Sequence, residues 1–185
     1  KINENDVDSI TNTILINSYF PQKIHKLAFE NDINYIQIGT DCVFSGLGGD
    51  YTEVSYKDAL DLYGKSKIVG EIEGSNKIVI RSSIIGPEQG IGFSLMNWFL
   101  NNQELVVSGY KNHMWNGVTT LNFAKIIEGI IMNNKINDFK TQHLIPKNVI
   151  SKANLLEQFK IHFKKQIDID HLDASSVINR TLKSN

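Results

Sequence analysis

Residues 34–40 read NYIQIGT, a short apolar run with two isoleucines that ends in glycine and threonine. A run of this length, rich in β-branched residues and bounded by turn-forming residues, is typical of a buried strand. The segment that follows, residues 41–54, is rich in Gly and Asp and indicates a loop. We therefore predict that a buried strand feeds a loop here and that Thr40 lies at the carboxyl end of the strand.

The segments around this strand alternate between helical and strand patterns. Residues 7–31 carry apolar side chains at helical spacing, and Pro21 should force a kink or a restart. Ser55, with an acidic residue three positions later, predicts a capped helix that runs to about Glu73, and residues 77–83 (KIVIRSS) predict a second buried strand. This order of helices and strands favours an α/β fold with a parallel sheet.

The second half of the chain has a looser pattern. We expect an amphipathic segment, a short strand, an aromatic loop (GYKNHMWNG), a helix, another strand and a last helix, at 93–100, 105–107, 109–117, 120–132, 142–145 and from about 151 onward. The tail from Gln166 onward is irregular, and we assign it little structure.

Composition and charge argue against several classes of partner. The 185 residues carry a net charge of −1 from 19 basic and 20 acidic side chains, without a long block of either sign. This balance does not select for nucleic acid or for an anionic membrane, and no apolar run approaches the roughly 18 residues of a membrane span. A single cysteine excludes an internal disulfide, and the histidines lack the spacing of a metal site. We expect a cytoplasmic protein without a metal.

The segment 60–71, LDLYGKSKIVGE, places Tyr63 and Lys67 four residues apart in a predicted helix. Positions i and i+4 share one face of a helix, so the ammonium group can lie near the phenol oxygen. Free tyrosine has a pKa of about 10, and a close positive charge lowers it toward the range of efficient proton transfer. The pair can therefore carry acid–base chemistry, although the same spacing is common in helices without a catalytic role.

Four motifs follow one another in order: TDCVFSG at 40–46, YTE at 51–53, YGKSKIVGE at 63–71 and RSSIIG at 81–86. This ordered set resembles extended short-chain dehydrogenases/reductases, most closely the dTDP-4-dehydrorhamnose reductase-like branch of sugar-nucleotide reductases. The resemblance is dense over 36–86 and looser elsewhere. It implies an α/β fold: the C-terminal part of a Rossmann-like doubly wound parallel sheet plus a small α/β substrate-binding portion.

The resemblance also implies catalytic roles for individual residues. Tyr63 would give a proton to the substrate carbonyl oxygen, Thr40 would hydrogen-bond to that oxygen, and Lys67 would hold the nicotinamide ribose while lowering the tyrosine pKa. Asn17, in the helix before the strand, would complete a proton relay, unless it is only a polar residue at the helix kink. The implied cofactor is NADPH or NADH.

Further residues are expected to bind ligands. Those implied at the cofactor ribose are Tyr63, Lys67, Arg81, Ser82 and Ser83. Those implied at the nucleotide-sugar substrate lie after the first strand and in the aromatic loop: Asp41, Cys42, Val43, Lys111, Asn112, His113, Trp115 and Asn116. Alternatives stay open, because Arg81 could be ion-paired, Asp41 could cap the loop, Cys42 could be a small buried residue, and the aromatic loop could serve packing.

The same resemblance implies a division of the chain. Residues 1–86 would form the remaining half of an NAD(P)-binding domain with the catalytic residues, and 87–185 mainly the substrate-binding portion, with strands that return to the sheet. A Gly-rich turn between a first strand and helix is not found in the sequence, because FSGLGGDY (44–51) follows the catalytic strand and indicates a flexible loop. We therefore expect that roughly three βα units, on the order of 70 residues, are missing.

The implied activity is NAD(P)H-dependent reduction of a nucleotide-linked 4-keto-deoxysugar in surface polysaccharide biosynthesis. An epimerase or dehydratase of the same superfamily and a non-catalytic regulatory or binding subunit are the alternatives. The intact Thr40, Tyr63 and Lys67 favour an enzyme. Dehydratases of this superfamily read TDE after the strand, whereas TDC stands at 40–42, which favours net reduction. A homo-oligomer stays possible.

Overall fold

The computed structural model describes residues 2–71, 73–88, 92, 94–136 and 140–184. The helices are α1 (Val7–Ile14), α2 (Phe20–Glu30), α3 (Leu62–Gly70), α4 (Leu95–Asn101), α5 (Thr120–Met132) and α6 (Lys152–His162), with a π-helical turn η1 (Leu15–Tyr19) and a 3-10 turn η2 (Asp41–Val43). The strands are β1 (Tyr35–Gly39), β2 (Lys77–Arg81), β3 (Ile84–Ile85), β4 (Val106–Tyr110), β5 (His113–Trp115), β6 (Val118–Thr119), β7 (Thr141–His143), β8 (Ile150–Ser151), β9 (Asp168–Leu172) and β10 (Ile178–Asn179).

Three parallel strands form the main sheet in the order β1-β2-β7. The central strand β2 is buried along its whole length, as its apolar sequence predicts. Its register with β1 runs from the pair Tyr35–Lys77 to the pair Gly39–Arg81. The carboxyl ends of these two strands therefore meet, and the residues that follow them lie at one edge of the sheet.

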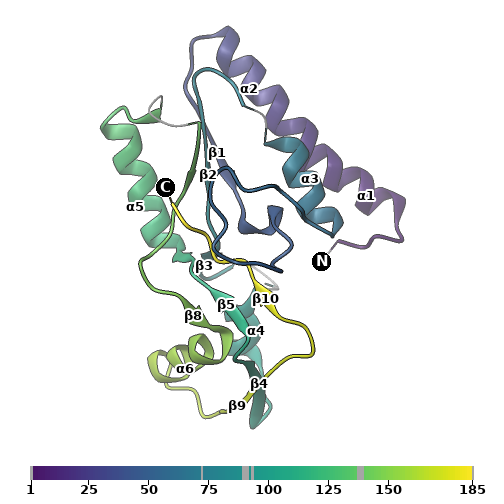
Figure 1. Ribbon diagram of the computed structural model, residues 1–185, viewed down its shortest axis with the longest axis vertical. Helices are drawn as coiled ribbons and strands as arrows, with labels where there is room; N and C mark the ends of the chain where they lie inside the picture. The colour runs from purple at the N-terminus through teal and green to yellow at the C-terminus, as the bar shows by residue number, and fades with distance from the viewer. Residues whose placement is uncertain (1, 72, 89–91, 93, 137–139, 185) are drawn as a thin grey trace.

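Helices lie on both faces of this sheet (Figure 1). On one face, Ile78 and Ile80 of β2 pack against Phe123 of α5. On the other face, the Gln37 side chain of β1 donates a hydrogen bond to the carbonyl of Gly70 at the end of α3. This arrangement confirms the α/β class with a parallel sheet.

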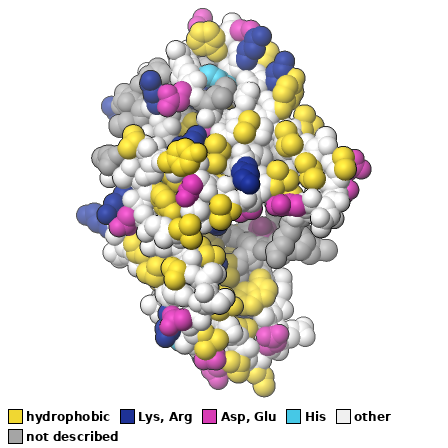
Figure 2. All heavy atoms as spheres, turned by 45° about the vertical axis from the view of Figure 1, so that its right-hand side comes forward, with side chains coloured by type: hydrophobic (Ala, Val, Ile, Leu, Met, Phe, Trp, Pro, Cys, Tyr) yellow, Lys and Arg dark blue, Asp and Glu magenta, His cyan; other side chains and the backbone are white. Residues whose placement is uncertain are grey.

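The lower part in Figure 1 has its own apolar core between α4, α6 and β4. Its buried members are Met96, Phe99, Val107, Leu155, Leu156, Phe159 and Ile167. Hydrophobic side chains also lie at the surface among polar ones (Figure 2), and those of the α1–α2 helix that are exposed include Leu15, Ile16, Phe20, Leu27 and Phe29. Within the described residues, no helix is both long and apolar enough to cross a membrane.

The predicted kink near Pro21 takes the form of the π-helical turn η1, which joins α1 to α2. Proline has no N–H to donate to the carbonyl four residues earlier, so the regular ladder is interrupted here. The Phe20 N–H bonds to the carbonyl of Leu15, one residue further back than in an α-helix. The helix thus continues across the proline through one wider, π-helical turn.

The helix predicted from Ser55 begins later, at Leu62, so this prediction of its start was wrong. The Asp61 carboxylate caps α3 by accepting a hydrogen bond from the Gly64 N–H at 2.7 Å. Asp58 instead accepts hydrogen bonds from the N–H and the hydroxyl of Ser45, both at 2.7 Å. Its partner is therefore a distant loop and not the local backbone.

Two further segments differ from the sequence-based expectation. The aromatic loop 109–117 forms the end of β4 and the whole of β5, and the tail supplies β9 beside β4 and β10 beside β5. These strands were missed because their partners lie far away in the sequence. Residue 93, where the amphipathic segment was expected to begin, lies outside the described residues, and α4 begins at Leu95.

The loop 44–51 was expected to be flexible, but it is held along its length by residues 178–183. Backbone bonds join Asn179 N–H to Gly46 O at 2.7 Å, Tyr51 N–H to Thr181 O at 2.9 Å, and Lys183 N–H to Tyr51 O at 2.8 Å. We call residues 178–183 the tail clasp.

Candidate active site

Thr40 and Tyr63 meet at the carboxyl end of β1. The Thr40 hydroxyl accepts a hydrogen bond from the Cys42 N–H at 3.1 Å, donates to Asp41 Oδ1 at 3.2 Å, and lies close enough to the phenol of Tyr63 to lower the pKa of that group. Gly64 permits this approach, because a Cβ there would collide with the Cys42 carbonyl oxygen. The structure thus brings together two of the residues that the motifs predicted as catalytic.

The environment raises the pKa of Tyr63. Burial is the main cause, the neighbouring Cys42, Asp41 and Asp61 add to it, and Thr40 acts in the opposite direction. This direction is opposite to the lowering that was expected from Lys67, because burial disfavours the charged phenolate. A phenol with a raised pKa keeps its proton at neutral pH and is a weaker acid than free tyrosine.

Lys67 lies one turn after Tyr63 on α3 and is partly buried. Burial lowers its pKa, and the negative charge of Glu71 acts against this. Glu71 follows α3, and its N–H bonds to the Lys67 carbonyl at 3.1 Å. Glu71 thereby helps to keep Lys67 charged beside the tyrosine.

Arg81 forms a buried ion pair with the same glutamate. Its Nη2 and Nε atoms lie 2.9 and 3.0 Å from Glu71 Oε2, and Nη1 lies 3.3 Å from both the Glu53 carbonyl oxygen and His143 Nε2. The ion pair that was left open as the alternative for Arg81 is therefore present.

The two serines after Arg81 are also engaged within the protein. Ser82 Oγ donates to the Leu144 carbonyl at 2.8 Å, and Ser83 Oγ accepts from Trp115 Nε1 at 2.8 Å. Contact of residues 81–83 with a cofactor stays a prediction.

Asn17 lies in η1 and contacts α3 at Ser66, one turn after the tyrosine. Its Nδ2 donates to Ser66 Oγ at 3.1 Å, and Ser66 Oγ donates to the Tyr63 carbonyl at 2.8 Å. The structure thus joins Asn17 to the backbone of the tyrosine helix. Its role in a proton relay stays a prediction.

Asp41, Cys42 and Val43 form η2 directly after Thr40. Asp41 is buried, and burial raises the pKa of its carboxyl group while the charge of Arg180 acts in the opposite direction. Burial and the neighbouring Asp41 raise the pKa of Cys42 to about 11. Val43 is fully buried in a cluster with Phe44 and Leu182.

The polar residues of the aromatic segment contact the C-terminal part of the chain. Asn112 exchanges two hydrogen bonds with the backbone of Ala174, and Asn116 exchanges two with the backbone of Leu182. The other contacts are Lys111 with Asp173 at 3.4 Å and His113 Nε2 with the Ser176 carbonyl at 3.1 Å. Packing, the alternative left open, accounts for these contacts, and substrate binding by residues 111–116 stays a prediction.

Sequence reasoning missed Arg180, which the tail clasp brings to the site. Its Nε donates to the Phe44 carbonyl at 2.9 Å, Nη1 lies 3.8 Å from Cys42 Sγ, and Nη2 lies 4.0 Å from Asp61 Oδ2. Lys152 lies in the same electrostatic environment, since burial and Arg180 lower its pKa while Asp41 and Cys42 act against this. Only the contacts in three dimensions reveal either residue.

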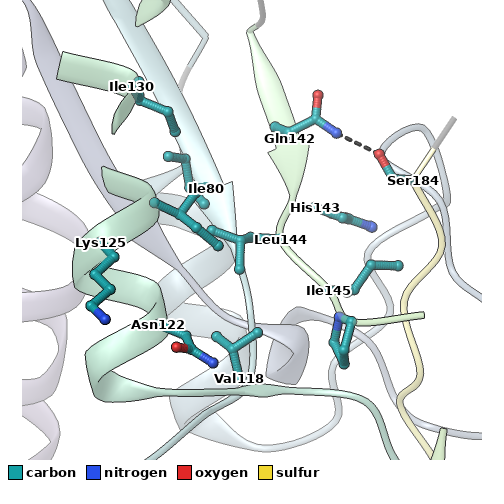
Figure 3. A pocket seen from close by; sticks show the side chains of 12 residues that line it. Ile80, Val118, Asn122, Lys125, Ile130, Gln142, His143, Leu144, Ile145 and Ser184 are labelled. Atoms are coloured by element: carbon teal, nitrogen blue, oxygen red, sulfur yellow. Dashed lines mark hydrogen bonds between the residues drawn. The ribbon is translucent and has the colours of Figure 1, made fainter. Parts of the chain in front are cut away.

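A hollow of about 450 Å³ lies beside Tyr63 and is also lined by Ile2, Glu4 and Asp61. Two larger hollows, of about 710 Å³ each, lie elsewhere. Figure 3 shows the one between α5 and β7, where Leu144 and Ile145 lie near the hydrogen-bonded pair Gln142 and Ser184. Among the described residues that line these larger hollows, none belongs to the predicted catalytic set.

In the described ranges, no group of three or more His, Cys, Asp or Glu side chains could hold a metal ion.

A parallel sheet with helices on both faces and polar side chains at its carboxyl edge defines a Rossmann-like α/β protein. The sequence matches the family described as RmlD substrate binding domain over residues 6–158, and the chain belongs to this family. No curated protein matches the sequence.

Solved structures with the same fold include a dTDP-4-dehydrorhamnose reductase from Clostridium acetobutylicum, with 16% identity, a TM-score of 0.77, and coverage of 96% of this chain and 65% of that one. The reductase from Bacillus anthracis in complex with NADP has 14% identity, a TM-score of 0.76, and coverage of 91% and 63%. The dTDP-glucose 4,6-dehydratase of the same organism, in complex with NAD, has 18% identity, a TM-score of 0.73, and coverage of 92% and 59%. The chain thus spans less than two thirds of the length of these structures.

Proposed function

We propose that the protein is a cytoplasmic reductase that uses NADPH or NADH to reduce a nucleotide-linked 4-keto-deoxysugar in surface polysaccharide biosynthesis. The observation that carries this proposal is the closeness of Thr40, at the carboxyl end of β1, to the phenol of Tyr63, whose pKa it lowers, with Lys67 one turn further along α3. Membership of the RmlD substrate binding domain family and the likeness to reductase structures support it.

The side chains present fit the nicotinamide–ribose end of such a cofactor. The phenol and the ammonium group come from α3 and the hydroxyl comes from the end of β1, and the hollow of about 450 Å³ borders Tyr63. The loop 44–51 does not fit the pyrophosphate, because Gly49 lies against the Asn179 side chain of the tail clasp. We therefore assign the residues of this chain to the reacting end of the cofactor only.

In the proposed reaction, Tyr63 donates its proton to the carbonyl oxygen of the sugar, and Thr40 donates a hydrogen bond to the same oxygen. A nicotinamide held by these residues would supply the hydride to the carbonyl carbon, and the products would be an alcohol and the oxidised cofactor. The raised pKa of Tyr63 keeps the proton in place before the reaction. Lys67 then stabilises the phenolate that is left behind.

Cys42 favours reduction over dehydration. Elimination of water requires an additional acid–base group near the sugar, and a thiol with a pKa of about 11 stays neutral and is a poor base. The full-length protein should therefore oxidise NADPH when given a dTDP-4-keto-6-deoxysugar and should not dehydrate dTDP-glucose. Incubation with each sugar nucleotide, with cofactor absorbance and product mass as readouts, tests this. Dehydration of dTDP-glucose without net oxidation of NADPH would refute the proposal.

A further inference from the structure

The tail clasp lies against the segment that carries the strand-end hydroxyl. Its backbone pairs with the loop 44–51, and Leu182 packs in one buried cluster with Val43 and Phe44. The clasp lies outside residues 6–158, over which the family match extends.

Within the clasp, Arg180 is joined to Thr40 by a chain of polar contacts. Arg180 Nη1 lies 3.8 Å from Cys42 Sγ, and Cys42 Sγ lies 3.7 Å from Asp41 Oδ1. The same carboxylate oxygen accepts the hydrogen bond from the Thr40 hydroxyl at 3.2 Å. The second anchor of Arg180 is the Phe44 carbonyl, to which Nε donates at 2.9 Å.

Arg180 also reaches the start of the tyrosine helix. Its Nη2 lies 4.0 Å from Asp61 Oδ2, and the other carboxylate oxygen of Asp61 caps α3 two residues before Tyr63. Arg180 additionally lowers the pKa of Asp58, whose carboxylate binds Ser45 of the loop. The charge of Arg180 therefore acts on carboxylates of the strand end, the loop and the helix cap.

We propose that Arg180 is a positioning residue that holds η2 and the start of α3 in the arrangement that brings the Thr40 hydroxyl close to the Tyr63 phenol. The surrounding charges favour this role over direct binding of a substrate phosphate. Arg180 lies 4.0 Å from the Asp61 carboxylate and acts electrostatically on Asp41 and Asp58, so carboxylates already balance its charge. The catalytic part of this inference rests on the proposed reductase function, but the structural part does not.

The test compares Arg180→Met and Arg180→Lys with Lys183→Gln in the full-length protein. Lys183 offers a matched control, because it is also a positively charged residue of the tail clasp. Its ammonium group forms an ion pair with the exposed Asp50 carboxylate at 2.9 Å. The first measurement is the rate at which a disulfide reagent labels Cys42, with the modified peptide identified by mass. Cys42 is the one cysteine among these 185 residues.

Loss of the Arg180 charge alone would raise the thiol pKa further and slow the labelling, whereas loosening of η2 would speed it. We expect Arg180→Met to label about tenfold faster than the wild type, Arg180→Lys to be intermediate, and Lys183→Gln to be unchanged. Labelling of Arg180→Met that is unchanged or slower overturns the proposal. If Arg180→Met does not fold, the labelling rate of Arg180→Lys is compared with that of the wild type instead, and a rate that is unchanged or slower overturns the proposal.

The second measurement is the kinetics of reduction. A positioning role predicts that kcat of Arg180→Met falls about tenfold while KM for the sugar nucleotide stays within about twofold, and that Arg180→Lys restores part of kcat. A raised KM with an unchanged kcat would instead show that Arg180 binds substrate, and would overturn the proposal. If the wild type reduces no 4-keto sugar, the proposed function fails, while the labelling of Cys42 still decides the role of Arg180.

Discussion

Seven apolar side chains fill the core of the lower part, whereas the layer between α3 and the sheet buries Glu71, Arg81 and His143. The apolar core is held by the area that it removes from water, and each contact there is non-directional. The polar layer depends on particular pairs, because a buried charge that loses its partner is strongly unfavourable. The region beside the candidate site should therefore tolerate paired changes better than single ones, and the stability of the lower core should depend on how much buried volume a substitution removes.

The largest effect is expected from Arg81→Met. This change leaves the buried Glu71 carboxylate without its closest cation, and we expect a loss of about 3–5 kcal/mol in the free energy of unfolding. The double variant Arg81→Met/Glu71→Gln removes both charges and should recover most of this loss. Urea unfolding of both proteins checks the prediction, and a double variant as unstable as the single one would contradict it.

In the lower core, Leu156→Ala should cost about 3 kcal/mol, because the side chain is 2% exposed and its removal leaves a cavity. Leu156→Met keeps nearly the same volume and should cost less than about 1.5 kcal/mol. The same unfolding measurement applies. A similar loss for both substitutions would mean that shape, and not buried area, decides the stability of this core.

Tyr63→Phe separates chemistry from stability in the polar region. The ring stays and the proton is lost, so turnover of the full-length protein should fall by about 10²-fold or more, while the free energy of unfolding changes little. Tyr56→Phe is the matched control, because Tyr56 is 85% exposed. Reductase turnover and thermal unfolding are the measurements, and an unchanged turnover of Tyr63→Phe would remove this residue from the mechanism.

The smallest effect, with the opposite sign, is expected at Lys77. Burial is the main reason that its pKa falls to about 8, so at neutral pH the folded protein holds a charge that its interior disfavours. Lys77→Met should therefore stabilise the protein at pH 7 by about 1–3 kcal/mol.

This gain should depend on pH in a defined direction. Below pH 8 or so, both the folded and the unfolded chain carry the Lys77 proton, and the cost is fully present. As the pH rises toward about 10.5, the folded wild type loses this proton first and regains stability relative to the variant. Unfolding curves at pH 7 and pH 10 check this, and a gain that is equal at both values would contradict the assignment to Lys77.

Local patterns predicted the central elements of the fold well. The runs NYIQIGT and KIVIRSS contain β1 and β2, because each strand is buried and its apolar sequence needs no distant partner to be recognised. The ordered motifs located Thr40 and Tyr63, and the structure brings these two residues together. Both successes rest on sequence patterns that can be recognised without knowing which distant residues lie beside them.

The failures of the sequence analysis share a different cause. Asp58 was read as part of a helix cap, but its carboxylate binds Ser45 across a loop. The strands β9 and β10 were missed because their partners, β4 and β5, lie some 60 residues away, although Ile167 and Ile169 alternate with polar residues at β9. Arg180 has no local signal at all, since only the folded chain brings it to Cys42 and Asp61.

The tail clasp also has a consequence for the order of events during synthesis. Asp50 and Thr181, which are joined by a hydrogen bond at 2.9 Å, are separated by 131 positions in the chain. The loop beside Thr40 therefore leaves the ribosome long before the residues that hold it, and contacts of such long range form late in folding. The catalytic centre should be among the last parts of the molecule to reach its final geometry, and nascent chains that end before residue 178 should carry the motifs without the site.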